Sequence, residues 1–257
     1  MQQDFIGKIQ RLIQKIQSEK DLVKSEADTE SVFVEPFLEI LGYKASDART
    51  LKRQYPASFG TKGNDSKVDY AILENDKPLV IIEVKHYTVK LDDYIGQLKG
   101  YFAACIKTCH FGILCNGIVY YFFSNIQNER EMDIKPFFHI DLAQGVFHKE
   151  MKFLQKFVKG VINPSEIRKY IQQMDILQKI ESKITKEIQE PSDEFVRFFK
   201  EISGKQNLQG RTKREFVQSI KQAFENVIDT KVQARIKELQ SKNIQNNNAK
   251  LSKKHKV

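Results

Sequence analysis

The chain has 257 residues, enough for one large domain or for one medium domain with a substantial appendage. Lys and Arg number 42 against 33 Asp and Glu, so the formal net charge is +9, which favours a polyanionic partner such as DNA, RNA or an anionic membrane. No apolar run reaches the roughly 18 residues that cross a bilayer, and residues 1–17 lack the apolar stretch of a signal peptide. These features predict a cytoplasmic protein with no membrane segment.

The N-terminal part of the chain is predicted to be helical. Apolar residues between Phe5 and Ile16 recur close to the 3.6-residue period, which predicts an amphipathic helix over 4–23. A second helix is expected to begin near residues 28–30 and to end at Gly42. Pro36 lies inside that second pattern, where it either kinks the helix or marks its true first turn.

From about residue 50 the pattern changes to the alternation typical of β-strands. Strands are expected over 68–73 and 79–84, joined as a hairpin by a three-residue connection at 75–77. A helix is expected over 91–106, and two further strands flank Asn116 and Gly117, a pair favoured in type I′ turns. With a last strand at 137–142, the order of elements predicts an α/β fold whose mixed sheet is flanked by helices and which ends near residue 150.

The remaining residues are predicted to form an all-helical C-terminal region. Apolar stripes opposite charged faces predict helices over 147–159, 165–186, 191–203 and 212–240. We therefore expect an α/β domain at 1–150, a helical region at 151–240, and a basic, disordered tail at 241–257. The helical region is expected to bind DNA, a partner subunit or a second copy of the chain.

Three cysteines, Cys105, Cys109 and Cys115, form no CxxC pair, and we interpret them as buried thiols. A zinc site from Cys105, Cys109 and His110 is an alternative, but no second pair of ligands follows at finger-like spacing. The sequence therefore favours thiols over a structural metal.

The most informative residues are Asp69 and the Glu83-Val84-Lys85 triplet. Side chains two apart on a strand share a face, so Glu83 and Lys85 point together while Val84 points to the other layer. The expected hairpin connection also places Asp69 opposite Glu83 on that same face. The alternative is that Glu83 and Lys85 form an exposed ion pair on an edge strand, with Asp69 a solvated strand-end residue.

Three ionisable groups that meet on a buried strand are costly unless something compensates their charges. Two carboxylates, Asp69 and Glu83, together with the Val84 carbonyl and water, make the oxygen-rich site that Mg²⁺ prefers, and Mn²⁺ is a natural substitute. Lys85 beside the ion could orient or deprotonate an attacking water and balance charge on a phosphate. This reading predicts phosphodiester hydrolysis without a covalent intermediate.

The pattern Asp69, then Glu83-Val84-Lys85, then Gln97-Leu98-Lys99-Gly100-Tyr101 resembles the nuclease domain of type I restriction enzyme R subunits, in the PD-(D/E)-X-K superfamily. The resemblance runs from about residue 30 to 142 and includes FGILCNGIVYYFF, which is similar to the family's "TNG" strand pair with Cys115 in place of threonine. Val68 occupies the position before Asp69 where the motif has a proline, so the proline is absent from this chain. The chain has no GxxxxGK[ST] phosphate loop, so ATP-driven translocation is not expected.

The resemblance implies roles for further residues. Asp69 and Glu83 would ligate the metal, joined by Glu30 as the acidic residue of the first helix, and Lys85 would act on the water. Gln97 and Tyr101 match the family's Q-x-x-x-Y element, one helical turn apart, which implies a catalytic role for Gln97 and DNA contact for Tyr101. Lys99 is a further candidate for contact with phosphate.

These observations together predict a magnesium-dependent DNA endonuclease from a restriction or other phage-defence setting. Two alternatives stay open: a non-catalytic DNA-binding or assembly module that keeps the fold as a scaffold, and an RNA nuclease. The converging charges of Asp69, Glu83 and Lys85 favour the enzyme, since a scaffold does not need them.

Overall fold

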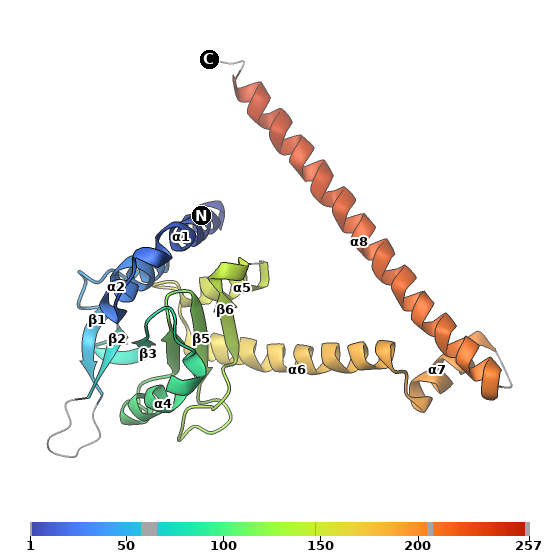
Figure 1. Cartoon of the computed structure of the whole chain (residues 1–257), viewed down its shortest axis with the longest axis horizontal. Helices are drawn as coiled ribbons and strands as arrows, with labels where there is room; N and C mark the ends of the chain where they lie inside the picture. The colour runs from blue at the N-terminus through green and yellow to red at the C-terminus, as the bar shows by residue number, and fades with distance from the viewer. Residues whose placement is uncertain (1, 58–65, 147, 205–207, 255–257) are drawn as a thin grey trace. The chain divides into compact units, whose positions relative to one another are not determined.

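Six strands form one mixed sheet in the N-terminal part of the chain (Figure 1). The computed structural model describes residues 2–57, 66–146, 148–204 and 208–254. The strands follow one another across the sheet in chain order, and all neighbours are antiparallel except β3 and β4, which are parallel. They are β1 (Leu51–Pro56), β2 (Lys67–Glu74), β3 (Lys77–Val84), β4 (Phe111–Cys115), β5 (Val119–Ser124) and β6 (Phe138–Asp141).

The register between β2 and β3 is the one that the sequence predicts, although the turn differs. Tyr70 pairs with Ile82, so the next position along brings Asp69 beside Glu83. The connection is a two-residue turn, because Glu74 pairs with Lys77 while Asn75 and Asp76 both have positive φ, as a type I′ turn requires. A bulge between Ile72 and Leu73 shifts the pairing by one residue and restores the expected register.

The type I′ turn expected at Asn116 and Gly117 does not form there. Only Gly117 has positive φ, and the side chain of Asn116 instead accepts hydrogen bonds from the backbone N–H groups of Ile118 and Val119. Gly117 cannot be replaced easily, since a Cβ at this position would lie 2.7 Å from the Cβ of Phe33. The turn between β4 and β5 thus packs directly on the helices that precede the sheet.

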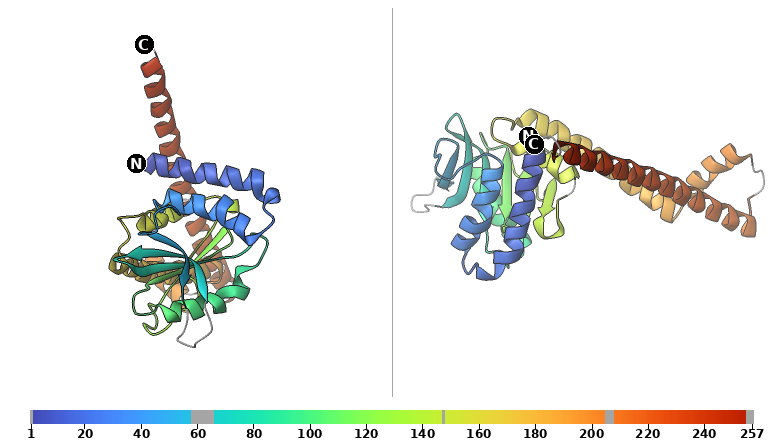
Figure 2. Two further views of the ribbon diagram at one scale, coloured as in Figure 1. Left: turned by 90° about the vertical axis from the view of Figure 1, so that its left-hand side faces the viewer. Right: turned by 90° about the horizontal axis from the view of Figure 1, so that it is seen from above.

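Helices cover both faces of the sheet, as Figures 1 and 2 show. One face packs on α1 (Gln2–Glu19), α3 (Glu35–Ile40), α5 (His148–Leu154) and the first turns of α6 (Pro164–Gln189), and its strand residues include Ile82 and Val84. The other face packs on α4 (Ile95–Ala104) and includes Ile81. Because side chains alternate along β3, Glu83 and Lys85 point to the α4 face.

The segment before β1 is divided more finely than the sequence suggests. Ser25 caps α2 (Glu26–Thr29) in a capping box with Asp28, so the helix begins earlier than the expected 28–30. A π-helical turn (Glu30–Val34) follows, and Pro36 lies in the first turn of α3. Of the two readings of Pro36, the first-turn position is therefore the one observed, where the missing N–H has no helical partner to lose.

The chain divides into two compact units, Met1–Gln172 and Gln173–Val257. The first unit includes residues 151–172, which the sequence assigned to the helical region, because Phe153, Phe157 and Ile167 are buried in the core on the α1 side of the sheet. The fold is thus an α/β sheet flanked by helices, followed by a helical C-terminal region.

The second unit is entirely helical within its described residues. It contains the end of α6, α7 (Asp193–Ser203) and α8 (Gly210–Lys254), and a small core forms around Val196, Phe216 and Ile220. Helix α8 runs to Lys254, so it includes most of the tail for which disorder after residue 240 stays a prediction. The sequence contains no Gly or Pro after Gly210, so nothing in the backbone interrupts that helix. Among the described helices, none has the length and apolar character to cross a membrane.

Candidate active site

Asp69 is fixed in place by two hydrogen bonds from neighbouring strands. Its Oδ2 accepts from the backbone N–H of Val84 at 2.8 Å, and its Oδ1 accepts from Nε2 of Gln54 at 3.2 Å. Burial raises the pKa of Asp69, against the effect of the Val84 hydrogen bond. The carboxylate of β2 is therefore tied to β3 at the point where Glu83 lies.

Glu83 is the most buried carboxylate of the site, with only 2% of its surface exposed. Its Oε1 accepts from Nζ of Lys85 and from Nε2 of Gln97, each at 2.7 Å, whereas Oε2 is buried and has no hydrogen-bond partner among the described residues. Burial first, and then the charge of Asp69, raise the pKa of Glu83 to about 7. Two carboxylates thus share a site that has one unsatisfied oxygen, which favours uptake of a proton or of a cation.

Lys85 carries the positive charge of the site. Its Nζ lies 2.7 Å from Glu83 Oε1, 3.9 Å from Oε1 of Glu26 and 5.3 Å from the centre of the Tyr94 ring. Burial lowers the pKa of Lys85, but the Glu83 hydrogen bond and the surrounding carboxylates outweigh it, so the pKa is raised on balance. Lys85 therefore stays charged while it holds Glu83 in orientation.

Helix α4 brings Gln97 and Tyr101 to the site, one turn apart as expected. Gln97 donates to Glu83 and, at 3.1 Å, also to the hydroxyl of Tyr101. Lys99 points elsewhere, because its Nζ pairs with Oε2 of Glu131 at 2.8 Å. Its contact with phosphate, like that of Tyr101 with DNA, stays a prediction.

Glu30 lies close to the site but is engaged by other residues. Its Oε2 accepts from the hydroxyl of Tyr70 at 2.8 Å and lies 3.8 Å from Arg53 Nη2, and both partners also contact Glu35. Burial, with a smaller contribution from Asp69, raises the pKa of Glu30. Its role as a metal ligand stays a prediction.

Three further residues complete the site and were not singled out from the sequence. Gln54 bonds to Asp69 from the edge strand β1 with an unusual φ of 48°, while Glu26 and Tyr94 flank Lys85. Only their spatial neighbours identify them, since no motif or period marks these positions.

Asn116, in contrast, explains the "NG" motif: its amide donates to the carbonyls of Tyr87 and Val89 and so fixes the segment that follows Lys85.

The donor set fits a magnesium ion held by two carboxylates. Within the part of the chain that the structure describes, no group of three or more His, Cys, Asp and Glu side chains is arranged to hold a metal ion. The finding also covers Cys105, Cys109 and His110, the residues of the alternative zinc site. Cys105 is only partly buried, unlike the buried thiol that was expected there. Mg²⁺ commonly uses one or two carboxylates and keeps several waters, so Asp69 and Glu83, with the unsatisfied Oε2 of Glu83, suffice.

The six-stranded mixed sheet with its flanking helices is consistent with a restriction-endonuclease-like fold. Residues 50–131 match the family described as type I restriction enzyme R protein N terminus. This confirms the predicted resemblance over β1 to β5 and relates that part of the chain to restriction enzymes; Glu30 lies outside the matched residues. No curated protein and no solved structure shows a significant match to the chain.

Proposed function

We propose that this chain is a magnesium-dependent endonuclease that hydrolyses phosphodiester bonds of DNA in a restriction system. The observation that carries the proposal is the buried Glu83 carboxylate, whose Oε2 has no partner among the described residues although Asp69 lies beside it. Burying one carboxylate beside a second, half-buried one costs free energy that a purely structural role would avoid. A divalent cation offsets that cost and makes the arrangement useful.

Asp69 and Glu83 would hold the ion, with the Val84 carbonyl as a third oxygen donor. Bound Mg²⁺ would supply charge stabilisation for the phosphate and its leaving oxygen and would make a water more acidic. The protein contributes rigidity: the Val84 N–H and the Gln54 amide orient Asp69, and Lys85 with Gln97 orients Glu83. Carboxylates fixed in this way lose little entropy when they take up an ion.

Lys85 is placed to serve the water and the phosphate. As a charged ammonium beside two carboxylates it can donate a hydrogen bond to an incoming phosphate oxygen or to the attacking water, and so orient either one. Gln97 lies on α4, in reach of Glu83 and Tyr101, and keeps the Glu83 carboxylate from rotating. The residues of the site therefore divide into ion-holding, water-orienting and positioning groups.

The net charge of +9 and the family match support DNA as the substrate. The experiment incubates the purified full chain with supercoiled plasmid, linear duplex, single-stranded DNA and RNA, each with Mg²⁺, Mn²⁺ or a chelator. We expect cleavage of DNA with Mg²⁺ or Mn²⁺, and loss of nearly all cleavage in Asp69→Ala, Glu83→Ala and Lys85→Ala while DNA binding is retained. Cleavage of RNA alone would assign the site to an RNA nuclease, and DNA binding without any cleavage would assign the fold to a scaffold.

A further inference from the structure

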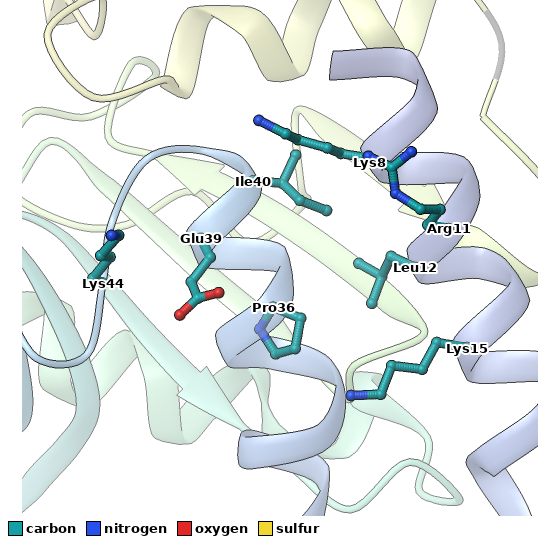
Figure 3. Close-up of a pocket in the computed structure, with 8 residues that line it drawn as sticks. All are labelled: Lys8, Arg11, Leu12, Lys15, Pro36, Glu39, Ile40 and Lys44. Carbon is teal, nitrogen blue, oxygen red and sulfur yellow. The ribbon is translucent and has the colours of Figure 1, made fainter. Parts of the chain in front are cut away.

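A groove of about 410 Å³ lies between α1 and α3, in the helical layer on the side of the sheet away from α4 (Figure 3). Three cations of α1, Lys8, Arg11 and Lys15, line it at spacings of three and four residues and so share one face of the helix. Lys44 lines it from the loop after α3. Figure 3 shows Lys8 and Lys15 extending from α1 toward α3, with Glu39 lying between α3 and Lys44.

The cations of this groove outnumber its carboxylates. Glu39 is the acidic residue among those that line it, and among the described residues neither Arg11 nor Lys44 forms an ion pair with a carboxylate. Lys8 pairs with Asp4 at 2.8 Å, while Lys15 lies 3.9 Å from Glu19, and both pairs are solvent-exposed. Exposed pairs of this kind hold their partners weakly, so these two lysines can exchange their carboxylates for another anion.

We propose that the groove between α1 and α3 binds the phosphodiester backbone of a nucleic acid, at a site separate from the proposed catalytic centre. Lys8 and Lys15 are about 10 Å apart along the helix axis, at about 1.5 Å per residue, which is too long for one phosphate and spans successive phosphates of a strand. Lys8, Arg11 and Lys44 are exposed, so successive phosphates of one strand can reach them from solvent. The floor of the groove, which includes Leu12 and Ile40, offers apolar contact to sugar.

The groove and the proposed active site lie on opposite sides of the sheet. The groove lies in the α1 layer, whereas Glu83, Lys85 and Gln97 meet on the α4 face of the sheet. Nucleic acid bound to the groove therefore contributes affinity without entering the proposed active site. Binding in the groove requires no catalytic activity and is therefore independent of the nuclease assignment.

The test is fluorescence anisotropy of the full chain with a short labelled duplex, in chelator so that no cleavage intervenes, from about 50 to 200 mM salt. Arg11→Gln combined with Lys44→Gln should weaken binding on the order of tenfold or more at 0.1 M salt and should reduce the salt slope by up to about two. The matched control is Lys107→Gln with Lys135→Gln, which removes the same charge at two exposed lysines outside the groove and should change affinity far less. Glu39→Gln removes the groove's carboxylate and should tighten binding, a gain that damage to the fold cannot imitate.

Equal affinity of the groove variant and the parent, or equal losses in the groove and control variants, would overturn the proposal. The proposal would also be overturned if the Arg11 and Lys44 substitutions weakened binding of anionic vesicles or pyrophosphate but left duplex binding unchanged. Melting midpoints of all variants establish that each is folded. An inactive plasmid assay with intact groove-dependent binding would reject the proposed nuclease and leave this site standing.

Discussion

Gln97 of α4 donates a hydrogen bond to Glu83 of β3 at 2.7 Å, on the same oxygen that Lys85 holds. This bond joins a helix and a strand through two residues that are 14 positions apart in the chain. Its consequence is that the orientation of a buried carboxylate depends on the position of a whole helix.

Gln97→Ala should reduce cleavage by about 10- to 100-fold, because it frees the Glu83 carboxylate to rotate without removing it. The dependence on Mg²⁺ should move to higher concentration, since a mobile carboxylate holds an ion less tightly. Steady-state cleavage over a magnesium series measures both effects. Lys99→Ala is the matched control on the same helix, and because Lys99 pairs with Glu131 it should leave the magnesium dependence unchanged. Equal magnesium dependence in Gln97→Ala and the parent would contradict a positioning role.

The second prediction concerns Gln54, whose φ of 48° is rare for a residue other than glycine. Gln54→Gly keeps that backbone conformation and removes the hydrogen bond to Asp69, so stability should stay within about 1 kcal/mol while stabilisation by Mg²⁺ weakens. Gln54→Val should instead lose about 1–2 kcal/mol of stability, since a β-branched residue is strained at positive φ. Denaturant unfolding and thermal shift with Mg²⁺ separate the two effects. A fully retained magnesium shift in Gln54→Gly would show that Asp69 does not need this contact.

The third prediction follows from the crowding of Asp69 and Glu83. In chelator, Glu83→Gln and Asp69→Asn should each raise the melting midpoint, because one of two adjacent carboxylate charges is removed while the shape is kept. Lys85→Ala should lower it, because both carboxylates lose their cation. Mg²⁺ should stabilise the parent in a thermal shift assay and stabilise the two carboxylate variants far less, since a ligand stabilises only the state that binds it. Equal magnesium shifts in all four proteins would place the ion elsewhere.

Gly117→Ala should destabilise the first unit by about 2 kcal/mol or more. The glycine has a φ of 79°, and its added Cβ would meet Phe33 at 2.7 Å and Thr29 at 3.2 Å. Chemical denaturation measures the loss. Gly145→Ala is the control, because Gly145 also has positive φ but has no atom within 4 Å of its Cβ position. A loss no larger than that of Gly145→Ala would mean that the contact with Phe33 relaxes freely.

The last prediction is a pH dependence at Glu187 in the second unit. Hydrogen bonds from Lys183 and from the backbone N–H of Ser192 lower the pKa of Glu187 from 4.5 to about 2. A lowered pKa contributes stability that is present above 4.5 and is lost as the pH falls toward 2. Glu187→Gln should therefore melt below the parent at pH 7, and the gap should close under acid. Glu181→Gln, an exposed change on the same helix, should show no such closing gap.

The sequence by itself determined the features that repeat at short range. Alternation along β3 placed Glu83 and Lys85 on one face, and the hairpin placed Asp69 beside Glu83, because a strand has a strict period of two. The helical spacing of Gln97 and Tyr101 placed both on one side of α4 for the same kind of reason. The three-residue connection predicted at 75–77 was wrong, but the predicted register was still correct, because the bulge compensated for the shorter turn.

Only the tertiary structure decided which distant residues meet. Three residues from separate elements reach the site: Gln54, Glu26 and Tyr94. Glu30 instead accepts a hydrogen bond from Tyr70 and forms an ion pair with Arg53. The groove between α1 and α3 likewise exists only once the two helices pack together. The physical reason is that backbone geometry sets local periodicity, whereas contacts between elements depend on how the buried side chains of the whole core fit against one another.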